Sequence, residues 1–343
     1  MAKKVTVLFT GAGRRVELLR AFQAAHAALG LEGRIVAVDA DPLAPALQAA
    51  DAYELVPRSD DGDYVGSLLR VCRAHQVDLV FPVIDNDIPI LAEAAPRFAG
   101  DGIRVGTMAP EGARTASDKW ATARLLKEAG IEGPRTWLPE NLPARDSLTF
   151  PLYIKPRFGS GAKHTARIDG ADELQVFMRR VPDPVIQEFL EGPEITCDLA
   201  YSLDGEFLGM CQRRRIEVRS GEVQKGVTVW DADIARSCRT IGAALAAHGP
   251  ITIQCLFRGG QPCFTEINGR FGGGLPLAIA AGLDFPRWYL ALSAGIPVHL
   301  PEPGGYRQGL YLTRCDESFF CTGLDGGGDA HLSVERGPWL SQS

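Results

Sequence analysis

The sequence lacks several features that would assign it to a particular class of protein. It has no run of about 20 apolar residues, the length that a membrane-spanning helix requires, and its first residues lead into a β-like run rather than a signal peptide. Basic residues are not in excess, because 36 Lys and Arg stand against 42 Asp and Glu, for a formal net charge of −6. We therefore expect a cytoplasmic protein that binds neither a membrane nor nucleic acid.

Metal-binding and covalent-catalysis patterns are also missing. The eight cysteines include no C-x-x-C pair and the six histidines are scattered singly, so zinc spacing is absent. Cys315 and Cys321 are the closest pair in the C-terminal part, and we expect ordinary reduced thiols there. No Ser-His-Asp or Cys-His arrangement indicates a covalent nucleophile.

What is present is a globular composition, 45% hydrophobic and 23% charged, with an α/β pattern at the start. Strands separated by helices in the first third predict a parallel sheet with right-handed crossovers. From about Ser117 a helix, a glycine-rich loop and many β-like runs follow. We expect an N-terminal parallel α/β domain and then α+β subdomains, with boundaries at 1–110, 111–185 and 186–300 and a C-terminal extension over 301–343.

A glycine turn, Gly11-Ala12-Gly13, follows the first predicted strand. A dinucleotide fingerprint needs a third glycine at the position of Val16, and Asp39 is then the candidate ribose acid. Three interpretations stay open: a tight strand-to-helix turn, an anion- or substrate-binding loop at a helix N-terminus, and the cofactor site of an oxidoreductase.

Three lysines flank a second glycine loop. Lys119 begins a helix in Ser-Asp-Lys, Lys155 ends an apolar strand, and Lys163 closes the loop at 158–163. Glycine lets backbone N–H groups approach phosphates closely, and lysines neutralise phosphate charge. A second strand, over 185–190, ends before Gly192-Pro193, which leaves backbone groups free to pair with an adenine edge and places Glu194 where it can accept from ribose hydroxyls.

The strongest pattern is a pair of strands, 251–257 and 264–270, around a turn. Side chains alternate between the two faces of a strand, so Glu266, Asn268 and Arg270 share one face. An odd-length loop at 259–261 would set Gln254 opposite Glu266. Three oxygen ligands and one guanidinium would then lie on one surface, and oxygen ligation suits Mg²⁺.

These residues resemble the ATP-grasp superfamily over roughly residues 1–300, and most closely the ligases similar to the carbamoyl phosphate synthetase large subunit and the pyrrolysine-pathway ligase. The motifs that carry the resemblance are Ser-Asp-Lys at 117–119, Ile-Lys-Pro at 154–156, the loop at 158–163, the segment 187–194, Gln254, and Glu-Ile-Asn-Gly-Arg at 266–270. The resemblance implies a substrate-holding pre-ATP-grasp domain followed by two α+β subdomains that hold ATP between them.

The resemblance also implies a role for each matching residue. Mg²⁺, with Mn²⁺ as the alternative ion, would be bound by Gln254, Glu266 and Asn268, although many members have an acidic residue in place of the glutamine. Arg270 and Lys155 would stabilise the transferring charges. Contacts with ATP would come from Lys119, Lys155, a lid with Gly159, Ser160 and Gly161, the backbone of Glu188 and Leu190, the side chain of Leu256, and Glu194.

The implied reaction activates a small-molecule carboxylate with ATP as an acylphosphate, which an amine or ammonia then attacks. Two alternatives stay open: a carboxyphosphate- or carbamate-forming enzyme similar to the synthetase, and a non-catalytic ATP-binding regulatory protein. Homodimers are common among such relatives.

The substrate site is less specific. Arg213 or Arg215, on one face of a predicted strand, is a candidate for a bidentate contact with the carboxylate of an amino-acid-like substrate, and Lys225 lies in a loop that we place near the triphosphate. Asp85 and Asp87 follow a parallel strand, where such sheets bind ligands. They are candidates for holding a substrate amine, with helix capping as the competing interpretation.

Overall fold

The computed structural model describes residues 3–159, 161, 163–219 and 221–321, which form two compact units. Unit 1 draws on the chain up to Thr107, on Asp284–Leu300 and on the chain from Thr313, whereas unit 2 comprises Met108–Leu283 and Pro301–Leu312. The predicted Ser160 and the final glycine-rich stretch lie outside the described residues. The four domain ranges given above stay a prediction.

Unit 1 contains the parallel sheet that the sequence predicts. Its five strands have the order β3-β2-β1-β4-β5, and Val7 of the central strand pairs with Ile35 and Leu79. The strands are β1 (Val7–Thr10), β2 (Ile35–Asp39), β3 (Ala52–Leu55), β4 (Leu79–Pro82) and β5 (Arg104–Val105). The helices are α1 (Val16–Leu29), α2 (Tyr64–His75), α3 (Asp87–Ala99) and α9 (Phe285–Ser293), with a 3-10 helix, η1 (Pro45–Ala49).

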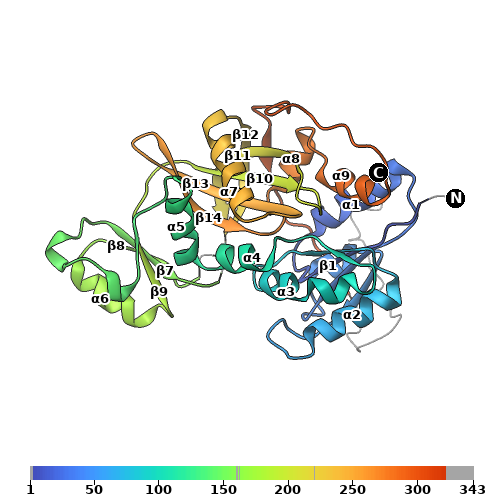
Figure 1. Ribbon diagram of the computed structural model, residues 1–343, viewed down its shortest axis with the longest axis horizontal. Helices are drawn as coiled ribbons and strands as arrows, with labels where there is room; N and C mark the ends of the chain where they lie inside the picture. Colours follow the sequence, from blue (N-terminus) through green and yellow to red (C-terminus); the bar gives the residue numbers. More distant parts are fainter. Residues whose placement is uncertain (1–2, 160, 162, 220, 322–343) are drawn as a thin grey trace. The chain divides into compact units, whose positions relative to one another are not determined.

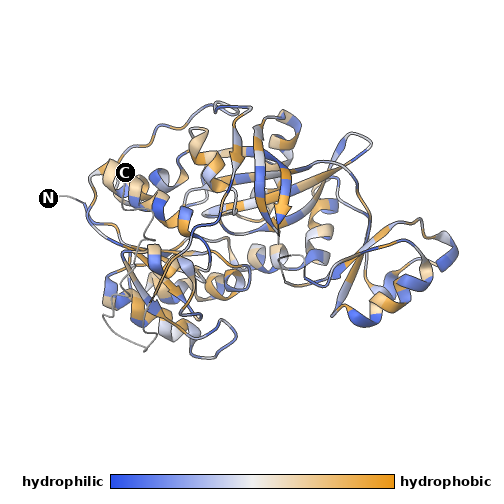
Figure 2. Cartoon of the chain, turned by 180° about the vertical axis from the view of Figure 1, so that it is seen from behind, coloured by the Kyte–Doolittle hydropathy of each residue, from blue (hydrophilic) through white to orange (hydrophobic). Residues whose placement is uncertain are grey.

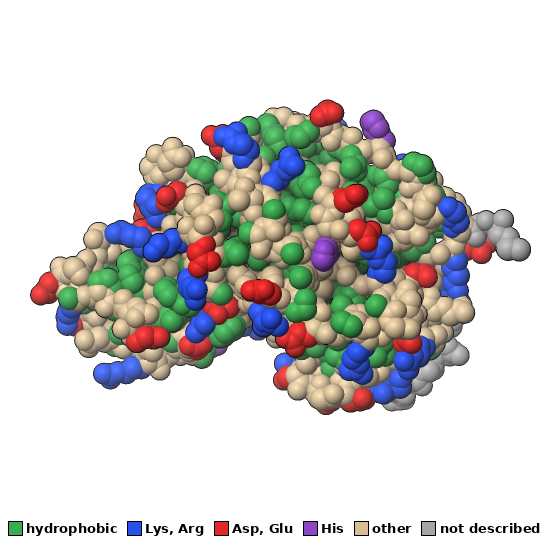
Figure 3. Space-filling model, viewed as in Figure 1, with side chains coloured by type: hydrophobic (Ala, Val, Ile, Leu, Met, Phe, Trp, Pro, Cys, Tyr) green, Lys and Arg blue, Asp and Glu red, His purple; other side chains and the backbone are tan. Residues whose placement is uncertain are grey.

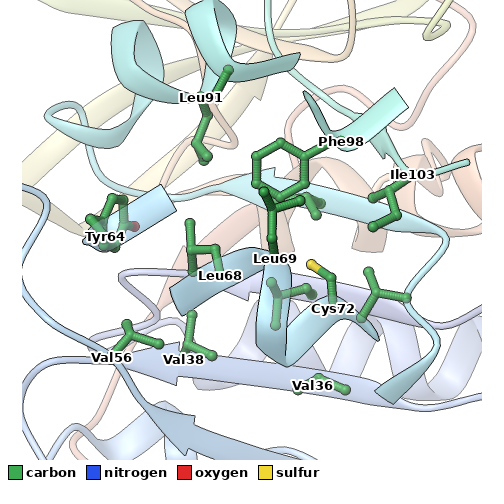
Figure 4. Close-up of a cluster of buried hydrophobic side chains, with 14 residues drawn as sticks. Val36, Val38, Val56, Tyr64, Leu68, Leu69, Cys72, Leu91, Phe98 and Ile103 are labelled. Carbon is green, nitrogen blue, oxygen red and sulfur yellow. The ribbon is translucent and has the colours of Figure 1, made fainter. Parts of the chain in front are cut away.

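One face of this sheet packs against α2 and α3. Figure 4 shows Val36 and Val38 of β2 facing the helical side chains of Leu68, Leu69 and Phe98. Leu68, Val36, Val38 and Phe98 have no exposed surface. The apolar residues of α2 fall on one side at helical spacing, and this side packs against the sheet.

An aromatic cluster on the other face joins distant parts of the chain within unit 1. The rings of Phe9 and Phe22 lie 4.9 Å apart, and that of Phe81 lies 5.1 Å from the ring of Tyr289. Helix α9 packs against α1 in the same region. The N-terminal sheet is therefore covered in part by residues from the 284–300 segment.

Unit 2 contains two antiparallel sheets (Figure 1). The larger has the order β14-β13-β10-β11-β12-β15 and the smaller the order β6-β9-β7-β8. The strands of the larger sheet are β10 (Glu194–Tyr201), β11 (Phe207–Arg219), β12 (Glu222–Val229), β13 (Pro250–Arg258), β14 (Gln261–Asn268) and β15 (Tyr311–Thr313). Those of the smaller sheet are β6 (Thr136–Trp137), β7 (Leu152–Pro156), β8 (Ala166–Ile168) and β9 (Pro184–Glu188).

Helices flank both sheets of unit 2. They are α4 (Pro110–Ser117), α5 (Lys119–Glu128), α6 (Ala171–Arg180), α7 (Ala232–Ala244) and α8 (Leu275–Ala280), with short 3-10 helices η2 (Pro139–Asn141) and η3 (Arg145–Ser147). Hydrophobic and hydrophilic residues alternate around α6, as Figure 2 shows. Its buried residue, Leu174, joins Ile154 and Ile186 in the core of the smaller sheet.

The surface matches the mixed charge of the composition. On the face drawn in Figure 3, acidic and basic side chains are interspersed. None of the described helices combines the length and apolar composition needed to cross a membrane. All eight cysteines are free, and six of them are buried.

Candidate functional site

The β13–β14 hairpin places Gln254 opposite Glu266, and Thr252 opposite Asn268. The pairing is as predicted, but the predicted odd-length loop is wrong. Gly259 and Gly260 form a two-residue turn, both with positive φ, as tight hairpin turns require. A β-bulge between Gln254 and Cys255 then shifts the register by one residue, which restores the predicted pair.

Glu194 connects two of the predicted site residues. Its Oε1 accepts from Nε2 of Gln254 and from Nη1 of Arg215, each at 2.6 Å. Because the amide nitrogen of Gln254 is directed to Glu194, its carbonyl oxygen faces away from that carboxylate. The structure gives Glu266 and Asn268 no side-chain hydrogen bond among the described residues, so their oxygens are uncommitted.

Gln254, Glu266 and Asn268 form a row of oxygen-bearing side chains on β13 and β14. Lys155, on the neighbouring sheet, lies near Glu266 of this row. It is 8% exposed, at the end of β7. Burial lowers its pKa to about 8, against the opposing charge of Glu266, and Lys119 lowers it further. A buried cation facing a carboxylate and a second lysine is an arrangement that favours an anionic ligand.

The Ser-Asp-Lys motif fixes the start of α5 to the glycine loop. Asp118 caps the helix by accepting from the backbone N–H groups of Trp120 and Ala121, and it binds Arg157 through two hydrogen bonds of 2.8 and 2.7 Å. Burial alone would raise the pKa of Asp118, but these hydrogen bonds lower it overall. Lys119 Nζ donates to the carbonyl oxygen of Gly159 at 2.7 Å.

Within the loop itself, Gly159 and Gly161 have positive φ. Glycine adopts this conformation without a steric penalty, and no Cβ at either position would meet a neighbour within 4 Å. The backbone of the loop is thus open on its outer side.

Glu188, at the end of β9, joins the smaller sheet to the hairpin. Its carboxylate accepts from Nε of Arg135 at 2.6 Å and from Nε of Arg258 at 2.8 Å, and its backbone N–H donates to the carbonyl oxygen of Arg135. Leu190 follows two residues later and is half-buried, as is Leu256 on β13. Arg135 and Arg258 were not singled out from the sequence, and nothing in their local pattern marks them.

The expectation that Arg213 binds a substrate carboxylate is not supported. Its side chain is 4% exposed and binds Asp198 in bidentate fashion, with Nε and Nη2 at 2.6 and 3.1 Å from the two carboxylate oxygens. Burial alone would lower the pKa of Arg213, but Asp198 raises it and keeps the guanidinium charged. The strand alternation gave the correct face but not its burial. A lone aspartate in the apolar strand Glu194–Tyr201 was the signal for this pair.

The other predicted cations of this region are also paired. Arg215 binds Glu194 and donates through Nη2 to the carbonyl oxygen of Gly221 at 2.8 Å. Lys225, predicted to lie in a loop, is on β12, where it is exposed and forms an ion pair of 2.6 Å with Glu217. Arg270 is half-buried, and its guanidinium donates through Nη1 to the carbonyl oxygen of Phe271 at 3.3 Å. Its own carbonyl oxygen accepts from Thr252 Oγ1 at 3.0 Å.

Asp85 and Asp87 belong to unit 1. Asp87 is fully buried, and its Oδ2 accepts from Thr10 Oγ1 and from the hydroxyl of Tyr64, each at 2.7 Å. Burial raises the pKa of Asp87. Asp87 is the first residue of α3, and the N-cap residue before it is Asn86, whose side chain makes no capping hydrogen bond. Asp85 is half-buried at the end of the sheet.

The first glycine turn is a tight strand-to-helix turn. Gly11 and Gly13 have positive φ, and Asp39 accepts from the backbone N–H of Gly13 at 2.8 Å and from that of Asp41 at 2.9 Å. Asp39 therefore stabilises the turn itself. Its carboxylate oxygens are engaged by the backbone rather than presented to a ribose.

Two family models match the chain. One describes a PylC-like N-terminal domain and matches residues 7–106, and the other describes an ATP-grasp in the biosynthetic pathway with Ter operon and matches residues 180–311. Both descriptions confirm the ATP-grasp assignment that the sequence predicted. The chain is an ATP-grasp enzyme, with the parallel N-terminal domain and antiparallel sheets of that fold.

Individual relatives are consistent with this assignment. The chain is 27% identical over 335 residues to a formate-dependent phosphoribosylglycinamide formyltransferase of Synechococcus sp. (strain RCC307), covering 91% of this chain and 81% of the relative. It is 26% identical over 175 residues to D-alanine–D-alanine ligase A of Bacillus cereus, covering 45% and 56%.

A solved structure extends the comparison to the fold. The biotin carboxylase domain dimer of a 2-oxoglutarate carboxylase from Hydrogenobacter thermophilus, in complex with MgADP and bicarbonate, superposes with a TM-score of 0.69 at 15% identity. The match covers 89% of this chain and 73% of that one.

Proposed function

We propose that this protein is an ATP-dependent ligase that joins a small carboxylate to an amine or ammonia through an acylphosphate, with release of ADP and phosphate. The observation that carries the proposal is the row of uncommitted oxygens on β13 and β14 beside the buried cation Lys155. The row suits a cation–polyphosphate complex, and the lysine suits the phosphates themselves.

The residues fit Mg²⁺. Among the described residues no group of three His, Cys, Asp or Glu side chains is placed to hold a metal, so the proposed set depends on amide oxygens. Gln254, Glu266 and Asn268 would hold the ion, or Mn²⁺ in its place, because oxygen donors suit both. A single carboxylate would leave most of the cation's charge available to offset that of the phosphates.

The nucleotide would lie between the two sheets of unit 2. Lys119 and Lys155 would contact the phosphates, and the backbone of Gly159 and Gly161, with Ser160, would cover them. The backbone of Glu188 and Leu190 would bind adenine, with Leu256 against the ring and Glu194 at the ribose. The clamp of Glu188 between Arg135 and Arg258 supports this assignment, because it fixes the strand whose backbone would meet adenine.

The chemistry needs charge stabilisation rather than a covalent nucleophile. A carboxylate oxygen attacks the γ-phosphorus and the bond to ADP breaks, which gives an acylphosphate. The amine then attacks the carbonyl carbon, loses a proton and expels phosphate, so one original carboxylate oxygen leaves with the phosphate. Lys155 and Arg270 would offset the repulsion between the anions in the first step.

The names of the relatives support small-molecule substrates. One acts with formate on phosphoribosylglycinamide and the other on D-alanine, so we propose an amino-acid-like substrate here. Arg215 and Lys225 are the remaining cationic candidates for its carboxylate. Asp85 of unit 1 stays a separate candidate for binding an amine, whereas the fully buried Asp87 does not. A homodimer is proposed by analogy with the carboxylase domain dimer.

The test combines nucleotide product analysis with an isotope transfer. The protein is incubated with Mg·ATP, pooled ¹⁸O-labelled carboxylates and pooled amines, and ADP is separated from AMP. We expect substrate-dependent ADP and one ¹⁸O atom in the phosphate. Glu266→Gln should abolish both signals, whereas Glu128→Gln, the same change on the exposed side of α5, should leave them unchanged.

Other outcomes would replace the proposal. AMP and pyrophosphate would mean adenylation. ADP formed with bicarbonate alone would favour the carboxyphosphate-forming alternative, for which the bicarbonate in the superposed carboxylase domain is the motivation. Tight Mg·ATP binding without turnover on any pool would favour the regulatory alternative.

A further inference from the structure

Arg213 and Asp198 form a buried ion pair directly beneath the backbone that follows Arg270. A Cβ added at Gly272 would lie 2.3 Å from Asp198 Oδ1, and one added at Gly274 would lie 2.3 Å from Arg213 Nη1. The backbone of Gly272 therefore packs against Asp198, and that of Gly274 packs against Arg213. With side chains 4% and 2% exposed, neither partner reaches solvent.

A third contact ties the same segment to the pair. Thr252 Oγ1 donates to the carbonyl oxygen of Arg270 at 3.0 Å and lies 3.4 Å from Asp198 Oδ1. The side chain of Phe271, in the same segment, is buried. The backbone between Asn268 and α8 is thus fixed by the pair, by Thr252 and by the Phe271 side chain.

We propose that Asp198 and Arg213 are positioning residues that hold the 270–274 segment, and through it the Arg270 guanidinium, in the geometry that phosphoryl transfer needs. The inference rests on the proposed function, because it assigns Arg270 to the transferring phosphoryl group. A rigid, bidentate pair is suited to this task since the planar guanidinium offers a flat surface that only glycine backbone can approach closely.

The glycine at 274 gives an independent sign of the pair's role. Its φ is −91°, a conformation open to any residue, so the backbone does not require glycine there. The requirement comes from the Arg213 guanidinium. Gly274→Ala should therefore be harmful only while Arg213 is present.

The experiment compares four variants: Arg213→Lys, the double variant Asp198→Asn/Arg213→Met, Gly274→Ala, and the triple combination. The double variant leaves no buried charge without a partner, which is the usual reason that such single variants fail to fold. Arg213→Lys keeps the positive charge but loses the two parallel hydrogen bonds that the guanidinium donates to Asp198. The control is Asp233→Asn/Arg236→Met, which removes an exposed pair on α7.

We expect the double variant to fold, and its kcat for ADP formation to fall by about 10- to 100-fold while the KM for ATP changes less than about twofold. Hydrogen exchange of the amides at 269–275 should accelerate in the double variant and in Arg213→Lys but not in the control. Gly274→Ala should lower kcat in the wild-type background and add nothing in the double variant.

The inference would be overturned if a folded double variant, or Arg213→Lys, kept both the wild-type hydrogen exchange at 269–275 and the wild-type kcat. Equal effects of Gly274→Ala in both backgrounds would also overturn it. If the wild-type protein forms no ADP from any substrate, the proposed function fails instead, and the exchange measurement still decides whether the pair holds the segment.

Discussion

Gln254 and Glu194 are joined by a 2.6 Å hydrogen bond in which the amide nitrogen donates to Oε1 of the carboxylate. The same oxygen accepts from Arg215. This bond selects one of the two orientations of the Gln254 amide, the one that directs its carbonyl oxygen away from Glu194. A residue assigned to the ribose thus also determines which atom of Gln254 is free to bind a cation.

Glu194→Ala should therefore weaken Mg²⁺ binding as well as nucleotide binding. We expect the Mg²⁺ concentration for half-maximal ADP formation, at saturating ATP, to rise by about tenfold, because groups behind a ligand typically contribute this much to metal affinity. Glu194→Gln keeps an acceptor oxygen and should change it less. An unchanged Mg²⁺ titration with a raised KM for ATP would confine Glu194 to the ribose.

Arg270→Ala should act on the chemical step. We expect a loss of kcat of about 10²-fold or more with little change in the KM for ATP, because the charge that Arg270 offsets develops during phosphoryl transfer. Steady-state kinetics measure both constants, with Arg179→Ala on the exposed side of α6 as the control. A change confined to KM would make Arg270 a ground-state binding residue.

The depressed pKa of Lys155 predicts how stability depends on pH. The pKa is about 8 in the folded protein and 10.5 for an ordinary lysine, so between these values the unfolded chain binds more protons. Stability therefore rises with pH across this window, by up to about 3 kcal/mol. Lys155→Met should lack this rise. Urea unfolding from pH 7 to 10 checks the difference, and parallel curves for the two proteins would contradict it.

The protonation of Lys155 should also affect the affinity for the nucleotide. As the pH rises above 8, the free protein loses the charge that the phosphates would bind, so the affinity for Mg·ATP should fall. Lys155→Arg stays protonated and should show a flatter profile. Calorimetric titration at pH 7, 8 and 9 measures it, and identical pH profiles for the two proteins would place the phosphates away from this side chain.

Asp87 predicts a dependence of the opposite sign in unit 1. Burial raises its folded pKa above the ordinary 3.8. Above pH 3.8 the folded state therefore binds more protons than the unfolded chain, and stability falls as the pH rises. Asp87→Asn should remove this fall and become more stable relative to the wild type from pH 4 to 7. Denaturant unfolding at several pH values tests it, and a constant difference between the two proteins would show that Asp87 does not titrate in this window.

The sequence was a good guide wherever a local pattern decides the structure. Helix α2 follows from its apolar periodicity, and the face shared by Glu266 and Asn268 follows from strand alternation. The facing of Gln254 and Glu266 was also predicted correctly, but through the wrong loop. A glycine turn and a bulge together shift the register as one extra loop residue would, and composition does not distinguish the two.

The sequence failed where a distant segment decides the environment. Arg213 lies on the predicted face, yet the segment after Arg270 covers it and Asp198 neutralises it. Asp39 is the last residue of β2, yet its carboxylate oxygens accept hydrogen bonds from the backbone of Gly13 and Asp41. In both cases, hydrogen bonds formed in the folded chain determine whether a charged group is available to a ligand, and a single sequence does not reveal them.

The discontinuity of unit 1 has a consequence for how the chain reaches its native state. During synthesis the first five strands emerge early, but Tyr289 and the rest of α9, which cover Phe81 and α1, emerge only after most of unit 2. The N-terminal sheet therefore leaves the ribosome with one apolar face only partly covered, by α1 alone. A nascent chain halted before residue 284 should expose that face to chaperones, and a fragment ending at Thr107 should aggregate rather than behave as an independent module.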